Sequence, residues 1–414
     1  MTALPPALDR SSALVRDETS ALRGLRDQFL VPEGVVYLDG NSLGAMPRTV
    51  PERISRAVTE EWGGGLISSW NSADWINLSR RVAGKIATII GVGGADVHVG
   101  DSTSVTLFKT MVAACRMRPE RGTIVMETST FPTDGYVAAG VASLLGLELR
   151  WCDPSQPAAS LDEDVALLAL THVDFRTGAM FDMGSVTRAA HEAGALMLWD
   201  LCHSAGAVSV ELSEHGVDFA VGCSYKYLNG GPGSPAYVYV APQHQRGLDQ
   251  PITGWMGHAR PFDMEREYVP VDGVGRMASG TPPVLALTAL DAALDVFGGI
   301  DHPTLRAASL SLTDYFIDLV DARLGDQLAV ITPREHARRG SQVSLRHEHA
   351  YGVVQALIER GVVGDFRSPD VARFGFAPCY VSHVDVYDAV DHLVSVMARE
   401  EFARPSYAIR NAVT

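Results

Sequence analysis

The chain has 414 residues, of which 46% are hydrophobic and 20% are charged, and its formal net charge is −15. This length allows two domains around a large core, and the composition is typical of a folded globular protein, which excludes disordered and fibrous classes. The acidity argues against a nucleic-acid partner and against anionic membranes, because both require a basic face.

The cysteines and the apolar segments indicate the compartment. The five cysteines are widely spaced and form no CxxC pair, so we expect neither disulfides nor a metal site. The N-terminus lacks the continuous apolar segment of a signal peptide, and no stretch reaches the roughly 20 apolar residues of a membrane span. We therefore expect a cytoplasmic protein without a membrane partner.

Strand-like and helical patterns alternate through the first part of the chain. A strand at 35–38 is followed by the turn 39–44, and a helix from Pro51 carries Ile54, Val58 and Trp62 on one face. Further helices are predicted at 76–91, 103–115, 136–145 and 186–192, and strands at 97–99, 123–126, 147–151, 165–170, 195–199, 217–223 and 236–240. This alternation predicts an α/β fold with a mostly parallel sheet that helices cover on both faces.

The last part of the chain predicts a smaller α+β unit. A long helical stretch begins after Pro283, and further strands and helices are predicted at 343–346, 351–360, 371–376 and 386–400. We expect a large domain at 65–285 and a small domain formed by 1–64 and 286–414, so that both chain ends contribute to it.

The most informative pattern is an aspartate and a lysine placed after successive apolar strands. Asp200 closes the strand at 195–199, Lys226 follows the apolar run 217–223, and a turn rich in glycine and proline comes next. Pyridoxal phosphate (PLP) chemistry needs a lysine that forms a Schiff base and a carboxylate that keeps the pyridine nitrogen protonated. An exposed lysine and a turn aspartate are the ordinary alternatives, and the pairing favours the cofactor site.

Hydroxyl groups at a helix start suggest where a phosphate would bind. Ser102, Thr103 and Ser104 open the helix at 103–115. Amides and hydroxyls at such a position form an anion site, although serine and threonine there are more often simple caps.

The chain resembles the kynureninases, a family of fold-type-I, aspartate-aminotransferase-like PLP enzymes. The resemblance extends from Tyr37 to the final helix and rests on the segments 37–44, 131–134, 200–203, 217–229, 254–258, 281–283, 360–363 and 371–376. It implies hydrolysis of the Cβ–Cγ bond of L-kynurenine, or of 3-hydroxykynurenine, to anthranilate and L-alanine, with PLP as the cofactor. It also implies a place in tryptophan catabolism or NAD biosynthesis.

The resemblance assigns roles to individual residues. It makes Lys226 the Schiff-base lysine, Asp200 the partner of the pyridine nitrogen, and Tyr225 a proton donor at the β-carbon, acidified by nearby cations. The other cofactor-binding positions that it implies are Thr103, Ser104, Phe131, Pro132, Thr133, Asp134, Thr171 and His203.

The remaining assignments concern the substrate and a second subunit. Arg373 would grip the substrate's carboxylate with its guanidinium fork, and Trp70 and Asn71 would lie near its aromatic ring. Trp255 and Thr281 match positions that approach the phosphate from the neighbouring subunit, which implies a homodimer with shared active sites. Family members with tryptophan and threonine at positions 70 and 281 favour kynurenine over its 3-hydroxy derivative.

Several alternatives remain open at this stage. Another PLP enzyme of this fold, such as an aminotransferase or a cysteine desulfurase, is one; the desulfurase would need a loop cysteine as nucleophile, for which Cys379 is the candidate. A kynureninase for a ring-substituted substrate in secondary metabolism is another, and a catalytically inactive relative is the third. Asp218 is interpreted as structural.

Overall fold

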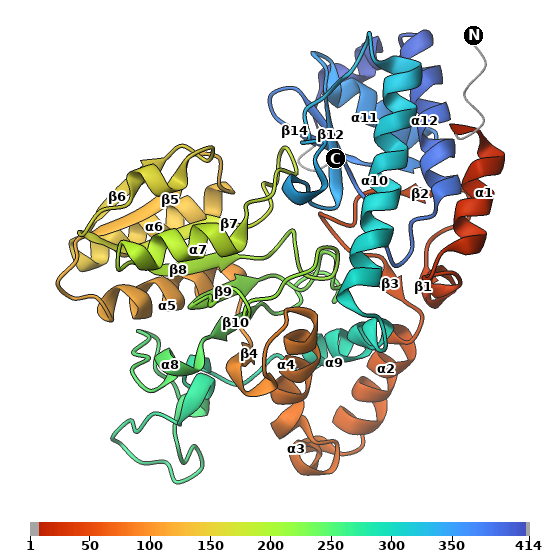
Figure 1. Ribbon diagram of the computed structural model, residues 1–414. Coiled ribbons are helices and arrows are strands. Elements are labelled where there is room, and N and C mark those ends of the chain that lie inside the picture. Colours follow the sequence, from red (N-terminus) through yellow and green to blue (C-terminus); the bar gives the residue numbers. More distant parts are fainter. Residues whose placement is uncertain (1–7, 411–414) are drawn as a thin grey trace.

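A seven-stranded sheet forms the centre of the larger part of the protein (Figure 1). The computed structural model describes residues 8–410. The strand order is β4 (Val97–Val99), β10 (Tyr237–Val240), β9 (Phe219–Gly222), β8 (Leu196–Asp200), β7 (Val165–Thr171), β5 (Thr123–Glu127), β6 (Glu148–Cys152). β10 runs antiparallel to both of its neighbours, and the other pairs are parallel. The predicted α/β class is therefore confirmed.

Side-chain alternation along the strands gives the sheet two buried faces. In β5, Ile124 and Met126 belong to the core under α5 (Thr103–Arg116) and α6 (Pro132–Leu145). Val125, between them, belongs to the opposite core, which includes Met183 of α7 (Met183–Glu192). Because successive side chains of a strand point to opposite faces, this pattern explains why the strands read as continuous apolar runs.

The helices that precede and follow the sheet pack below it in Figure 1. α4 (Leu78–Ile89) packs against β4 and α9 (Val284–Ala293), and its Val82 and Ile86 are fully buried. The other helices of this part are α2 (Val50–Arg56), α3 (Ser69–Ser72) and α8 (Pro242–Gln245).

The helix predicted from Pro51 differs from the expectation. After α2 it continues as a π-helical turn, Ala57–Trp62, and residues 8–410 leave its apolar face open: Val58 is 38% exposed and Trp62 56%. The pattern correctly indicates an amphipathic helix, but the amphipathic pattern does not reveal which surface covers the apolar face.

Segments from both chain ends form the smaller α+β part. Its antiparallel sheet has the order β11 (Ala329–Val330), β12 (Gln342–Arg346), β15 (Val371–Gly375), β14 (Asp365–Arg367). Its helices are α10 (His302–Leu324), α11 (Ala350–Glu359) and α12 (His383–Ala398). From the N-terminal end, β2 (Val36–Tyr37) pairs in parallel with β13 (Val362–Val363), while β1 (Phe29–Leu30) pairs with β3 (Met46–Pro47). The domain boundaries at 64/65 and 285/286 stay a prediction.

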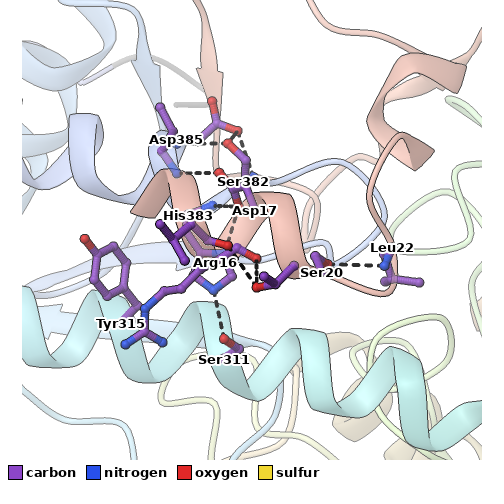
Figure 2. A network of polar contacts seen from close by, with 12 residues as sticks. Arg16, Asp17, Ser20, Leu22, Ser311, Tyr315, Ser382, His383 and Asp385 are labelled. Atoms are coloured by element: carbon purple, nitrogen blue, oxygen red, sulfur yellow. Dashed lines mark hydrogen bonds and ion pairs between the residues drawn. The ribbon is translucent and has the colours of Figure 1, made fainter. Parts of the chain in front are cut away.

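A polar network joins the first helix, α1 (Arg10–Thr19), to the C-terminal part (Figure 2). The Asp17 carboxylate accepts hydrogen bonds from the backbone N–H groups of His383 (2.7 Å) and Val384 (3.0 Å), and lies 2.8 Å from Nδ1 of the His383 ring. Nε2 of the same ring lies 2.8 Å from Oγ of Ser311 in α10. Asp17 therefore satisfies backbone donors at the start of α12, where the helix itself leaves them unpaired.

The structure also describes the cysteines and the apolar character of the helices. All five cysteines are buried and none is in a disulfide. Between residues 8 and 410, no helix combines the length and the apolar character needed to cross a membrane.

Candidate active site

The residues with the predicted chemistry meet at the carboxyl ends of the parallel strands. Thr171 ends β7, Asp200 ends β8, and Lys226 lies in the loop after β9. The starts of α5 and α6 face the same space, and together they line a cavity of about 240 Å³. In open α/β sheets this edge is where ligands bind, because the strand ends and helix starts converge there.

Lys226 is held by a turn that comes from far away in the sequence. The N–H of Gly44 donates to the carbonyl oxygen of Tyr225 (2.8 Å), so the predicted turn 39–44 packs directly against the lysine loop. A Cβ at position 44 would lie 2.2 Å from the Lys226 carbonyl oxygen and 2.4 Å from Oδ1 of Asn229. Only glycine allows this approach.

The lysine amine lies against a neutral histidine. Nζ of Lys226 is 3.0 Å from Nε2 of His203, which is 4% exposed. Burial, with the nearby charge of Lys226, holds the pKa of His203 well below its ordinary value. The imidazole therefore adds no positive charge beside the amine. The position of His203 in the cavity fits the prediction that it lies at the cofactor site.

Three buried carboxyl groups lie at the cavity: Asp134 and Asp200 line it, and Glu127 accepts a hydrogen bond from the N–H of the lining residue Thr171. Asp200 accepts a hydrogen bond from the Cys202 N–H (2.6 Å), which fixes its orientation. Burial and the charge of Asp200 raise the pKa of Asp134 well above its usual range, and burial raises the pKa of Glu127 to about 7. The raised pKa favours the protonated form of Asp134, which reduces the repulsion that a second carboxylate beside Asp200 would create.

The start of α5 borders the same cavity. Ser102 caps this 14-residue helix by accepting a hydrogen bond from the Val105 N–H, and no acidic residue lies in the first turn. Thr103 and Ser104 line the cavity. A helix start with hydroxyl groups and no acidic side chain fits a phosphate, and the buried Asp200 fits a pyridinium nitrogen, so the set of donors and acceptors matches PLP.

Aromatic side chains border the cavity. Phe131, 43% exposed, packs its ring edge-on against Phe175 at 5.3 Å between centroids. Tyr225 also lines the cavity, with Nζ of Lys226 5.9 Å from its ring centroid. The expectation that cations acidify Tyr225 is wrong: burial is the largest effect and raises its pKa. The phenol therefore keeps its proton.

Arg373 is buried on β15, not exposed at the surface of the small sheet. Its Nε donates to Asp365 (2.7 Å), its Nη1 to the Phe175 carbonyl oxygen (2.6 Å), and its Nη2 to Ser42 (2.9 Å) and to Asp365. The expected free guanidinium fork is therefore occupied by Asp365, and this part of the prediction needs correction.

Most of the predicted site residues lie together, and some do not. The cavity is lined by Thr103, Ser104, Phe131, Thr133, Asp134, Thr171, Asp200, His203, Tyr225, Lys226 and Arg373. Pro132 begins α6 behind this lining. Four predicted residues lie outside the cavity of their own chain: Trp70, Asn71, Trp255 and Thr281.

Sequence reasoning missed five lining residues: Asn41, Ser42, Phe175, Cys202 and Arg367. For Arg367 a signal existed. The β14–β15 hairpin pairs Asp365 with Arg373, and residue 367 shares the face of residue 365 because side chains alternate along a strand. No comparable local signal places Ser42 or Phe175 at the site.

Comparison with known proteins identifies the family. The chain is 49% identical over 413 residues to a kynureninase of Pseudomonas fluorescens, an alignment that covers 98% of this chain and 99% of the relative. The chain belongs to the kynureninase family. A kynureninase of Burkholderia pseudomallei is 48% identical with the same coverage, and the family model "Kynureninase C-terminal domain" matches residues 305–393. The protein is therefore an enzyme of the kynureninase type with PLP as its cofactor.

Solved structures with low sequence identity share the fold of this family member. A cysteine desulfurase of Thermococcus onnurineus has a TM-score of 0.76 at 18% identity, covering 91% of this chain and 97% of that one. A cysteine desulfurase of Escherichia coli has a TM-score of 0.74 at 19% identity, covering 91% of this chain and 98% of that one. At such identities the likeness concerns the fold alone.

Proposed function

We propose that this protein hydrolyses the Cβ–Cγ bond of L-kynurenine to anthranilate and L-alanine. The observation that carries the proposal is the placement of Lys226, Asp200 and Arg373 around one cavity, in a chain nearly half identical to enzymes named kynureninase. A cytoplasmic location belongs to the same proposal and is supported by five cysteines without a disulfide. A role in tryptophan catabolism or NAD biosynthesis is also part of it.

The side chains that line the cavity have separate roles in the reaction. Bound PLP supplies an electron sink for charge at the substrate's α- and β-carbons. The Lys226 amine removes and returns the proton at the α-carbon, and neutral His203, 3.0 Å away, leaves that amine the local base. Arg373, which lines the same cavity, orients the amino-acid part of the substrate.

Bond cleavage requires water and a proton donor. Water adds to the γ-carbonyl, the Cβ–Cγ bond breaks with its electron pair on Cβ, and the water oxygen leaves in the anthranilate carboxylate. Tyr225, whose phenol stays protonated, donates the proton to Cβ and is reprotonated by the proton that the added water releases.

A second copy of the chain completes the site in this proposal. Trp255 and Thr281 lie outside the cavity of their own chain, and Trp255 packs edge-on against Phe262, which is 61% exposed. The exposed Val58 and Trp62 form part of a second apolar surface that a partner subunit would cover.

Mixed dimers test this arrangement. Lys226→Ala and Trp255→Ala proteins, each inactive or strongly impaired alone, are unfolded together and refolded at equal amounts. Shared sites predict about a quarter of wild-type activity, because half of the dimers are mixed and each has one intact site. Activity that stays at the sum of the two separate variants would show that Trp255 serves its own chain or none.

The proposal also includes a preference for the aromatic ring of the substrate. Trp70 on α3 packs edge-on against Trp75 at 6.0 Å between centroids, so its indole is fixed in place. With Thr281 it would favour L-kynurenine over 3-hydroxykynurenine. The ratio of kcat/KM for the two substrates tests this, and a ratio below one, or higher efficiency with another ring-substituted kynurenine, would contradict it.

The cysteine desulfurase alternative lacks its nucleophile. Cys379 is 3% exposed, and burial raises the pKa of its thiol to about 12. A thiol of this kind is not a thiolate at neutral pH.

The site itself is tested by Lys226→Ala in the presence of PLP. The variant should lose turnover of L-kynurenine and the visible absorbance band of the wild-type protein with PLP, whereas Lys85→Ala should keep both, because Lys85 is paired with Asp291 and Asp295 outside the cavity. A Lys226→Ala protein with full turnover and an unchanged band would contradict the proposal. A wild-type protein that shows no such band would favour an inactive relative.

A further inference from the structure

Two arginines in the wall of the cavity, Arg367 and Arg373, form a cluster with one buried aspartate, Asp365. Asp365 and Arg373 are directly paired across the β14–β15 hairpin, and Asp365 is 2% exposed. Besides Arg373, Asp365 binds Nη2 of Arg367 at 2.7 Å, so one carboxylate holds two guanidinium groups. Both arginines line the cavity.

Ser42 connects all three side chains. Its hydroxyl donates to Oδ2 of Asp365 (2.6 Å) and lies in accepting distance of Nη2 of Arg373 (2.9 Å) and Nη2 of Arg367 (3.2 Å). The hydroxyl's donor and both of its lone pairs are therefore used, which fixes the two guanidinium groups relative to each other.

The N–H groups of the two arginines differ in availability. Arg373 makes four hydrogen bonds within the protein, to Asp365, Phe175 and Ser42, so a single N–H on Nη1 is left for a ligand. Nε of Arg367 is buried and makes no hydrogen bond to any residue between 8 and 410. Its Nη1 also makes no hydrogen bond to any of these residues, and because the Arg367 side chain is 33% exposed and lines the cavity, Nη1 is the group that can reach a ligand.

The charge of the cluster favours an anion. Burial and the charge of Asp365 raise the pKa of the neighbouring Asp39 to about 7, so that below neutral pH Asp39 is largely uncharged. Two guanidinium groups then face one carboxylate, and a net positive charge remains on this wall. An amino acid's carboxylate is the anion that the proposed substrate brings to it.

We propose that Arg367 is a second donor to the carboxylate of the substrate, beside Arg373, and that Asp365 is a positioning residue that holds both guanidinium groups. The proposal rests on the proposed function and deepens it. It replaces a single arginine fork by two guanidinium groups, of which Arg367 contributes the larger number of free N–H groups.

The test compares ligands with and without a carboxylate. Arg367→Gln should raise KM for L-kynurenine about tenfold to a hundredfold, the loss expected for a hydrogen bond to a charged group, while kcat changes by less than about threefold. The inhibition constant of the decarboxylated amine of kynurenine should stay within about twofold of that of the wild type. Arg367→Lys, which keeps the charge, should recover part of the loss.

A matched control is available on the same sheet. Arg346 of β12 is paired with Asp370 at 3.2 Å outside the cavity, so Arg346→Gln should leave both KM and the inhibition constant unchanged. An unchanged KM for Arg367→Gln would overturn the proposal. An Arg367→Gln substitution that weakens the binding of L-kynurenine and of its decarboxylated amine equally would also overturn it, because a purely structural role gives that result.

Asp365→Asn tests the positioning role. It should raise KM for L-kynurenine, and the double variant with Arg367→Gln should raise KM by less than the product of the two separate effects, because only Arg373 is then left for Asp365 to position. Two effects that multiply fully would contradict the role. If Asp365→Asn does not fold, the Arg367 variants still decide the main claim. If the wild type does not turn over L-kynurenine, the proposed function fails, and the two-arginine proposal is still tested by comparing wild-type and Arg367→Gln affinities for L-alanine and ethylamine.

Discussion

Removing the carboxylate of Asp39 should stabilise the protein, and more so at high pH. Burial is the main reason that its pKa rises from 3.8 to about 7 in the fold, and the charge of Asp365 adds to it. One of its oxygens, Oδ1, is buried and makes no hydrogen bond to any residue in the range 8–410. Asparagine keeps the shape and removes the charge that the fold disfavours.

The sign and size follow from the two pKa values. The folded protein binds the Asp39 proton more tightly than the unfolded chain, so stability falls as the pH rises from about 4 to about 7 and the full penalty is present above that range. A difference of about three pKa units corresponds to about 4 kcal/mol. Asp39→Asn should therefore gain about 1 to 2 kcal/mol at pH 5 and up to about 4 kcal/mol at pH 8.

Urea denaturation of the PLP-bound protein measures this effect. The free energies of unfolding of the wild type and of Asp39→Asn are determined at pH 5 and pH 8, with Asp326→Asn, at an exposed site, as the control that should change neither value. A gain that is equal at both pH values, or larger at pH 5, would refute the reasoning, because the proton linkage allows only an increase with pH.

Three further substitutions test the packing and the proton transfer of the site. Gly44→Ala should displace the loop of Lys226 and lower the PLP affinity at least tenfold by absorbance titration, since overpacking of this kind costs about 1 to 3 kcal/mol. Gly84→Ala, in α4 with open space around it, should instead raise the melting temperature, and the opposite order would contradict the packing argument. Tyr225→Phe should lower kcat about a hundredfold or more with KM little changed, and an unchanged kcat would exclude the phenol as the proton donor.

Local sequence patterns were sufficient for the large sheet and its chemistry. The parallel strands β5, β7, β8 and β9 are buried on both faces and therefore appear as apolar runs. The residues at the ends of β8 and β9 must meet because parallel strands end at one edge. This is why Asp200 and Lys226 could be paired from their order alone.

Other features depend on contacts that no local pattern contains. α10 was not singled out because its buried side includes polar residues: Thr313, which donates to the Ser309 carbonyl oxygen, and Ser309, which donates to Ser341. Ser42 reaches the site and contacts Arg373 only because the chain ends join. The guanidinium fork of Arg373 is occupied because the β14–β15 register places Asp365 beside it. The exposed face of Trp62 and the positions of Trp255 and Thr281 outside the cavity have no counterpart in a local pattern, and the proposed second subunit would account for them.

The most direct test of the central claim is the product analysis of a single reaction. The purified protein with PLP is incubated with L-kynurenine, without any 2-oxo acid, and anthranilate and L-alanine are quantified in the same sample. The two products should appear in equal amounts and in proportion to the substrate consumed. Loss of L-kynurenine without anthranilate, or no loss of L-kynurenine together with release of L-alanine and sulfur from L-cysteine, would contradict the assignment of this enzyme as a kynurenine hydrolase.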